Sequence, residues 1–321
     1  MQNFRKILEE YDFNINKNAT KRELHQKFKR LNRYINFSAT LKKNEMINII
    51  DKLSNYTKYY NYTEFLLGNK VIKPTAEQTS IIMAPTDKHT RIIACAGSGK
   101  TTTILFRIKY LIDNYTTPDK ILVLTFNVEA YLNLKRKITE LFGFEPKIEI
   151  RTIDSYSAKL YHLYCHELGN MGIKNIIVSE YSAIAQKILK KYGNIICNQY
   201  KYLFFDEFQD INDIQFNIIK SFGDNKCNLT IIGDDNQNIY QWRGTNNMYL
   251  INFDNMYKNT NTYTLSTNYR SNKSIIDLAN TSINYNINRI DKKMIPVDKT
   301  ENEPQLLLLK KKKKDLQKNF K

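Results

Sequence analysis

A glycine-rich run, Ala94–Thr101, joins an apolar segment to a helical one and has the sequence Ala-Cys-Ala-Gly-Ser-Gly-Lys-Thr. Gly97 and Gly99 let backbone N–H groups converge on an anion without interference from a Cβ atom, and the start of the helix adds its dipole. Lys100 can reach the β- and γ-phosphates of a nucleotide, and the Thr101 hydroxyl can ligate Mg²⁺. The run therefore predicts a loop that binds ATP and Mg²⁺, although alanine replaces the glycine that usually opens such a loop. The expected nucleotide contacts within it are Ala96, Gly97, Ser98, Gly99, Lys100, Thr101 and Thr102.

Two adjacent carboxylates, Asp206 and Glu207, follow a bulky apolar run further along the chain. Ligands bind at the carboxyl ends of the strands in parallel sheets, so Asp206 would hold the metal ion together with Thr101. Glu207 would orient and deprotonate the attacking water, because phosphoryl transfer depends mainly on positioning and charge stabilisation. An Asp-Glu pair alone is more often a solvated loop. The phosphate-binding loop upstream makes the catalytic interpretation the favoured one.

Polar side chains also follow two other apolar runs. Gln237 comes shortly after Gly233, and Tyr269 and Arg270 come shortly after Ser266. Gln237 offers an amide that could sense the γ-phosphate, and Arg270 offers a bidentate fork for phosphate. Tyr269 offers an aromatic face for a base. Either segment taken singly is more often structural, and the repeated position after apolar runs is what assigns both to the site.

Six short apolar runs must supply the strands that position these residues. They are Arg91–Ala96, Ile121–Phe126, Lys147–Ile153, Tyr202–Asp206, Leu229–Gly233 and Thr262–Ser266. Because helical stretches separate them, they predict a parallel sheet with right-handed crossovers, an α/β core flanked by helices. Two helical segments, Ser155–Leu168 and Ser179–Tyr192, interrupt the alternation and predict a small helical insertion at about residues 156–200.

The pattern divides the chain into three parts. These are a basic helical extension, an ATP-binding domain and a basic tail or truncated second lobe, at residues 1–70, 71–290 and 291–321. In the extension, Thr20 and Glu23 have capping-box spacing, and a second helix is expected over Lys43–Leu53. The extension is either an accessory domain or a basic arm that adds affinity for a polyanion. In the tail, Leu306–Leu309 predicts an edge strand or a frayed end.

The composition limits the class of protein. The chain has 321 residues, of which 42% are hydrophobic, and a formal net charge of +17. The hydrophobic fraction suffices for a core, and the charge suits a polyanionic partner, although a lysine-rich, solvated surface is the alternative. None of the four cysteines has C-x-x-C spacing, so free thiols are expected. No apolar stretch reaches membrane-spanning length, so we expect a soluble intracellular protein of cytoplasm or nucleus, or a virus-encoded one, with no membrane partner.

In order, and over most of residues 74–290, these features resemble the motifs of UvrD/Rep-type superfamily 1 DNA helicases. The similar stretches, from the Q motif through motifs I, Ia, Ib, II, III and IV, are Pro74–Gln78, Ala94–Thr101, Leu124–Asn127, Arg151–Ser155, Asp206–Asp210, Gly233–Gly244 and Asn268–Ser271. The resemblance implies a RecA-like P-loop NTPase fold. It also implies an enzyme that hydrolyses Mg-ATP to move 3′→5′ on single-stranded DNA.

The resemblance further implies roles for single residues. Gln78 would hydrogen-bond the adenine edge, Tyr269 would stack on the ring, and Gln237 and Arg270 would contact the γ-phosphate. Nucleic acid would be met by Thr125, Phe126, Asn127, Thr152, Ser155, Tyr240, Trp242 and Arg243. Aromatic stacking tolerates any base and contributes about 1–3 kcal/mol per base. Trp242, the only tryptophan, stands in a polar segment that suits stacking, and a core or interface anchor is the alternative.

Two departures from the family pattern bear on activity. The segment between motifs Ib and II is short, which reduces the DNA-gripping insertion to about two helices. Motifs V and VI are not found after Asn288. Loss of an arginine such as motif VI supplies costs about 10³–10⁵ in turnover in related systems. We therefore expect the chain to be incomplete alone. It is interpreted as part of a split gene, as a truncated reading frame, or as a domain that works with a separate polypeptide carrying the second RecA-like lobe. The alternatives are an ATP-responsive module that binds single strands without unwinding, and an RNA helicase.

Overall fold

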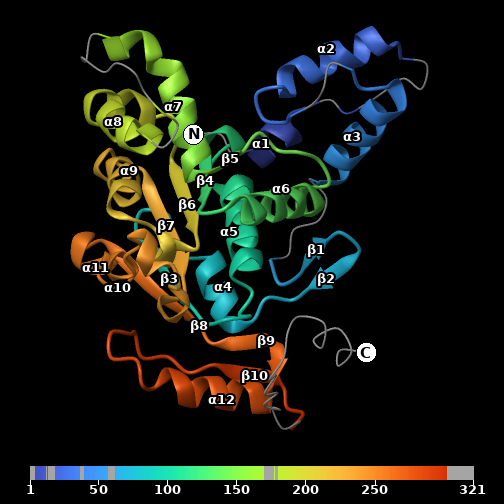
Figure 1. The fold of residues 1–321 in the computed structure, drawn as a ribbon. Coiled ribbons are helices and arrows are strands. Elements are labelled where there is room, and N and C mark those ends of the chain that lie inside the picture. Colours follow the sequence, from blue (N-terminus) through green and yellow to red (C-terminus); the bar gives the residue numbers. More distant parts are fainter. Residues whose placement is uncertain are drawn as a thin grey trace, which may run out of the picture.

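A parallel β-sheet runs through the middle of the molecule with helices on both faces (Figure 1). The structure is a computed structural model, and it describes residues 4–11, 13, 19–36, 40–56, 62–169, 177 and 180–301. Six strands form the sheet in the order β5-β4-β6-β7-β3-β8. In chain order, β3 to β8 span His89–Ala94, Ile121–Thr125, Glu149–Thr152, Tyr202–Asp206, Asn228–Gly233 and Thr260–Leu265. Each overlaps one predicted run and every pairing is parallel, so the predicted α/β fold is confirmed.

Alternation along the central strands explains why both faces of the sheet are covered. In β6, Tyr202 and Phe204 enter one hydrophobic cluster, whereas Leu203 and Phe205 enter the cluster on the other face. All four side chains are fully buried, and a strand buried on both faces has a continuous apolar sequence. One face carries α4, α5 and α6, at Ala76–Ile82, Lys100–Asn114 and Val128–Phe142 (Figure 1). The other face carries α7 to α11, at Ile153–Leu168, Tyr181–Cys197, Asp213–Asp224, Met248–Ile251 and Phe253–Met256.

The first three helices precede the sheet. Helices α1, α2 and α3 span Phe4–Glu9, Lys21–Leu31 and Lys43–Tyr56. The capping box between Thr20 and Glu23 is present at the start of α2, as the spacing predicts. Phe4 and Leu8 of α1 are fully buried in the same cluster as the α5 side chains, so α1 packs against the main core. A hairpin of β1, Phe65–Leu67, and β2, Lys70–Ile72, follows; strands of this length are too short to show a periodic pattern.

The last described elements form a separate two-stranded sheet beside a helix. Strand β9 spans Thr267–Asn272, α12 spans Lys273–Ile283 and β10 spans Ile295–Asp298. Strand β9 pairs in parallel with β10. The sequence predicts that Tyr269 and Arg270 follow a strand, and the structure places them inside a further strand, β9. This strand was not predicted because its sequence is polar. Residues 306–309 lie outside the described residues.

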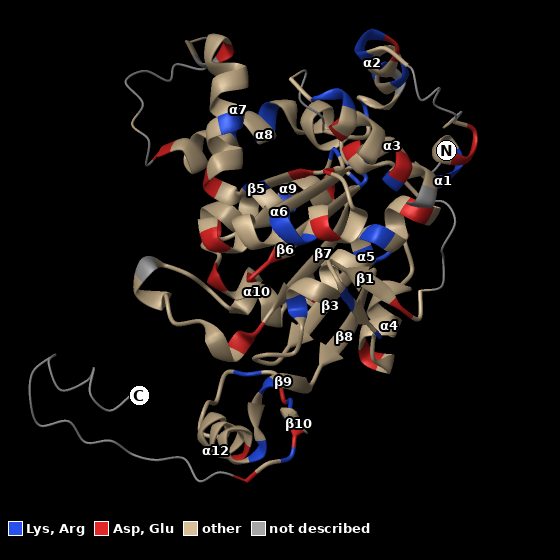
Figure 2. Ribbon diagram, turned by 90° about the vertical axis from the view of Figure 1, so that its right-hand side faces the viewer, with Lys and Arg blue, Asp and Glu red and all other residues tan. Residues whose placement is uncertain are grey.

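Three further observations concern the described part of the chain. Within it, no helix is both long enough and apolar enough to span a membrane. The four cysteines are free thiols, three of them buried. Lys and Arg gather on α2, while acidic and basic residues are interspersed over most other elements (Figure 2).

Candidate active site

The loop between β3 and α5 comes into close contact with β9. Gly97 and Gly99 have φ angles of +65° and +80°, in the left-handed region that favours glycine. A Cβ atom on Gly97 would lie 2.8 Å from the Cβ of Arg270. The Gly97 carbonyl accepts a hydrogen bond from the Tyr269 N–H at 3.0 Å. Glycine is therefore required at this position both by the backbone and by the neighbouring strand.

A pocket of about 360 Å³ opens over this loop. Its lining residues are Gly97, Ser98, Gly99, Lys100, Thr101, Thr102, Asn133, Lys137, Glu207, Gln237, Tyr269 and Arg270. The structure thus brings together predicted nucleotide contacts that lie far apart in the sequence. Asn133 and Lys137 of α6 were not predicted, because half-buried polar residues on a helix carry no motif signal.

An ion pair joins the loop to the end of β6. Lys100 Nζ lies 3.1 Å from Glu207 Oε2, and the two side chains are 12% and 28% exposed. Glu207 has a φ of 58°, a left-handed conformation that costs a non-glycine residue of the order of 1–3 kcal/mol. Gln209 Nε2 donates to the same Glu207 oxygen at 2.9 Å. The left-handed backbone of Glu207 and its contacts with Lys100 and Gln209 together orient the Glu207 carboxylate toward the pocket.

The hydroxyl of Thr101, which lines the pocket, lies beside the buried carboxylate of Asp206. Thr101 Oγ1 donates to Asp206 Oδ2 at 3.3 Å. Burial, and then the Glu207 charge, raise the pKa of Asp206 to about 6, against the opposing effect of Lys100. These are hard oxygen ligands of the kind that Mg²⁺ prefers, and a cation there would offset the cost of burying the Asp206 charge. The residues present therefore fit a divalent cation held by Thr101 and Asp206.

Gln237 reaches the pocket from the segment after β7. It lies in the short helix η5, Asp235–Gln237, and its Nε2 donates to Asp234 Oδ2 at 2.7 Å. The Asp234 N–H in turn donates to Gln209 Oε1 at 3.1 Å. Gln209 therefore bridges the ends of β6 and β7. No role was predicted for Gln209, because a bridge between segments leaves no local pattern.

A second unpredicted clamp involves Asn268 of β9. Its Nδ2 donates to the Ala96 carbonyl at 2.7 Å, and its Oδ1 accepts from the N–H groups of Arg270 and Ser271, each at 2.8 Å. The buried amide thereby fixes β9 against the loop. Arg270 and its neighbour Tyr269 are exposed on the pocket side of the clamp.

Gln78 stands apart from the other predicted nucleotide contacts. It is 5% exposed, and its Oε1 accepts from the Thr75 N–H at 3.1 Å in a capping box of α4. A Cβ on Gly99 would lie 3.0 Å from Gln78 Nε2, so the amide nitrogen faces the loop. Gln78 does not line the pocket described above.

Aromatic residues predicted to meet bases cluster at the same edge of the sheet. Phe126 follows β4 and Tyr240 follows η5, and their rings stack with centroids 6.1 Å apart and planes at 29°. Trp242, in the short helix η6, Gln241–Arg243, is 75% exposed. The Arg243 side chain lies outside the described part of the structure.

The remaining residues that were predicted to contact nucleic acid form hydrogen bonds within the protein. Thr125 is fully buried and its hydroxyl donates to the Asn127 carbonyl. Its contact with nucleic acid stays a prediction. Asn127 caps α6 by accepting from the Ala130 N–H at 2.8 Å. Thr152 caps α7 in the same way, accepting from the Ser155 N–H at 3.1 Å. These caps leave Asn127 exposed at one helix N-terminus and Ser155 half-buried at the other, where helix dipoles favour phosphate.

Comparison with known proteins gives one family and several relatives. A family described as an AAA domain matches residues 77–243, just over half of the chain. A putative ATP-dependent DNA helicase of Acanthamoeba polyphaga mimivirus is 33% identical, over 64% of this chain and 30% of that protein. A probable DNA helicase II homologue of Mycoplasma capricolum is 27% identical, over 67% of this chain and 41% of that protein. The DNA helicase PcrA of Leuconostoc citreum is 44% identical, over 34% of this chain and 14% of that protein.

Solved structures with a similar arrangement include the UvsW helicase of bacteriophage T4, at 13% identity and a TM-score of 0.38, over 76% of this chain and 77% of that one. The Pif1 helicase of Candida albicans matches at 17% identity and a TM-score of 0.35, over 60% of this chain and 39% of that one. The chain spans less than half the length of each of the three relatives in sequence.

Proposed function

The chain belongs to the UvrD/Rep-type superfamily 1 helicases, and on that premise we propose that it forms the ATP-binding lobe of an ATP-dependent DNA helicase or translocase. The observation that carries the proposal is a juxtaposition at one edge of the sheet. The pocket over the phosphate-binding loop and the stacked pair Phe126 and Tyr240 both lie after the carboxyl ends of the parallel strands. Nucleotide and single strand would therefore meet adjoining loops.

In the proposed reaction, the loop amides and Lys100 bind the triphosphate. Lys100 is paired with Glu207 in the structure, and phosphate oxygens would compete for its ammonium group. Glu207 would then be free to orient a water and accept its proton, while Gln237 and Arg270 stabilise charge on the γ-phosphate. Thr101 and Asp206 would hold Mg²⁺, which supplies neutralisation of phosphate charge when bound.

The proposed nucleic-acid partner is single-stranded DNA, and the relatives are named DNA helicases. Stacking on Phe126, Tyr240 and Trp242 is indifferent to base sequence, which suits movement along a strand. Movement in the 3′→5′ direction is the finer proposal. It predicts that a partial duplex with a 3′ single-stranded tail is a substrate and that one with a 5′ tail is not.

ATP hydrolysis by the purified chain, with and without oligo-dT, tests the proposal. We expect stimulation by the oligonucleotide, which Lys100→Ala abolishes and which the exposed control Lys70→Ala leaves unchanged. Stimulation that survives Lys100→Ala would overturn the proposal. Binding of ATP and oligo-dT without turnover would favour an ATP-responsive binding module, and stronger stimulation by poly-U would favour an RNA helicase. A polypeptide with a second RecA-like lobe, the proposed partner, would raise turnover when added.

A further inference from the structure

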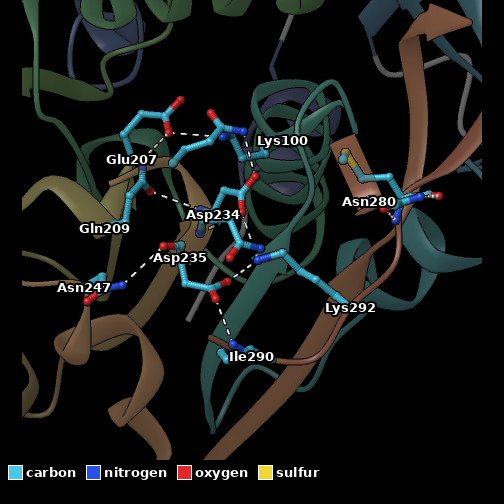
Figure 3. Close-up of polar contacts among 12 residues, drawn as sticks. Lys100, Glu207, Gln209, Asp234, Asp235, Asn247, Asn280, Ile290 and Lys292 are labelled. Carbon is cyan, nitrogen blue, oxygen red and sulfur yellow. Dashed lines mark hydrogen bonds and ion pairs between the residues drawn. The ribbon is translucent and has the colours of Figure 1, made fainter. Parts of the chain in front are cut away.

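A buried ion-pair cluster of three residues lies behind the nucleotide pocket. Lys292 Nζ lies 2.9 Å from Asp234 Oδ1 and is also paired with Asp235 (Figure 3). The Lys292 side chain is 3% exposed, and those of the two aspartates are 4% and 0% exposed. A lysine ammonium at such depth is stable only where carboxylates satisfy it, and each carboxylate likewise depends on the lysine. Lys292 has no part in the proposed function described so far.

The segment that carries Lys292 is fastened at both ends. The Ile290 N–H donates to Asp235 Oδ2 at 2.8 Å, which ties the segment to the end of β7. Further along, Met294 exchanges two hydrogen bonds of 3.0 Å with the Asn280 amide of α12 (Figure 3). Strand β10 begins at the next residue and pairs with β9. The segment therefore links the loop after β7 to β9, the strand that lines the pocket.

A continuous set of polar contacts leads from this cluster into the pocket. The Asp234 carboxylate receives Lys292 on Oδ1 and the Gln237 amide on Oδ2. On its backbone side, the Asp234 N–H contacts Gln209, which in turn donates to Glu207 (Figure 3). Lys292 thus shares one carboxylate with the residue proposed to sense the γ-phosphate.

We propose that Lys292 is a positioning residue for ATP hydrolysis. It holds the Asp234 carboxylate in the orientation from which Gln237 presents its amide to the γ-phosphate. Lys292 precedes β10, which pairs with β9. It therefore also fixes the position of the Gln237 amide relative to Arg270, which lines the same pocket from β9. The inference rests on the proposed function, because the step that Lys292 supports is the hydrolysis proposed for this pocket.

Lys292→Met tests the inference, because methionine keeps an unbranched side chain and removes the charge. The matched control is the adjacent, exposed Lys293→Met. We expect kcat to fall about tenfold to hundredfold in Lys292→Met, since small displacements of a catalytic group have effects of this size. The dissociation constant for ATP should change less than about twofold, since the phosphate-binding loop is untouched. If the role of Lys292 were purely structural, Lys292→Met would lower the melting temperature and would change kcat and the dissociation constant for ATP to a similar extent.

A second variant separates charge from position. Lys292→Met combined with Asp235→Asn restores the net charge of the cluster, so we expect the melting temperature to recover while kcat stays low. Trp242 emission gives a readout that needs no turnover, because the only tryptophan follows Gln237 closely in the chain. A non-hydrolysable ATP analogue should change that emission in the unsubstituted protein and not in Lys292→Met.

The outcomes separate the two proposals. Retention of both kcat and the Trp242 response in Lys292→Met, or recovery of both together with the melting temperature in the double variant, would overturn the role of Lys292. If the unsubstituted chain does not hydrolyse ATP even with oligo-dT and a polypeptide that carries a second RecA-like lobe, the proposed function fails. The response of Trp242 to the analogue then still decides whether Lys292 couples the pocket to this loop.

Discussion

At the scale of single residues, Gly97 shows how closely the loop and β9 approach. Alanine at this position would need a φ near +65° and would bring its Cβ to 2.8 Å from Arg270 Cβ. We expect Gly97→Ala to weaken ATP binding about tenfold or more and to lower the free energy of unfolding by about 1–3 kcal/mol. Isothermal titration with ATP and urea unfolding measure the two effects.

Gly169→Ala is the matched control for that substitution. Gly169 has helical φ and ψ angles, and a Cβ there would meet nothing within 4 Å. We expect unchanged ATP binding and a gain in stability of about 0.4–1 kcal/mol. Equal behaviour of the two variants would show that the loop and β9 are less tightly joined than their contacts indicate.

His89 is a single residue that makes the free energy of unfolding depend on pH. Its Nδ1 accepts a hydrogen bond from the Leu229 N–H at 3.0 Å, so the ring is neutral, and burial lowers its pKa below the usual 6.5. The unfolded state then binds more protons, so this contribution to the free energy of unfolding is present above about pH 6.5 and is lost as pH falls through the lowered pKa. His89→Asn keeps an acceptor without this titration. Urea unfolding at about pH 7.5 and about pH 5 should show the native protein losing more stability than the variant, and parallel losses would contradict the assignment.

At the scale of elements, a buried arginine joins α5 to the end of α4. The Arg107 guanidinium is 1% exposed and donates to the carbonyls of Ile82, Ala84 and Pro85. Arg107→Leu would leave these carbonyls without the charged donor, and each such bond contributes about 1.5–3 kcal/mol. We expect a loss of about 3 kcal/mol or more in the free energy of unfolding, measured by urea denaturation.

Arg136→Leu on α6 is the corresponding surface substitution. Arg136 pairs with Glu140 one turn away, and both side chains are largely or partly exposed. Such a pair contributes about 0.3–0.5 kcal/mol, so this variant should unfold close to the native protein. A similar cost for both arginines would show that the carbonyls at the end of α4 find other donors.

The elements also show what the sequence could and could not predict. The inner strands β3, β4, β6 and β7 were predicted because burial on both faces leaves continuous apolar runs. The edge strands β5 and β8 are only partly buried, and their predicted runs are less apolar. Strands β9 and β10 were not predicted, because β9 is polar and the two strands form by pairing with each other across the intervening helix α12. Gln209, Asn268 and Lys292 were missed for a related reason. Each acts by bridging segments that are distant in the chain, and such bridges exist only in the folded molecule.

At the scale of the whole molecule, charge and stacking make separable contributions to binding of a single strand. The net charge of +17 predicts affinity that falls steeply as salt rises, because bound phosphates release counterions. Trp242, at 75% exposure, presents an aromatic face whose stacking on a base does not depend on ionic strength in this way. The logarithm of the binding constant for oligo-dT, plotted against the logarithm of the salt concentration, separates the two contributions.

Trp242→Ala should lower affinity for oligo-dT by about 1–3 kcal/mol, roughly 5- to 150-fold, at every salt concentration. The slope of the plot should stay unchanged, because no cation is removed and the number of phosphates neutralised is the same. Trp242→Phe keeps an aromatic face and should restore most of the affinity. A changed slope in Trp242→Ala would mean that the residue orients the surrounding basic groups. Unchanged affinity would remove Trp242 from the proposed path of the single strand and leave Phe126 and Tyr240 as its stacking faces.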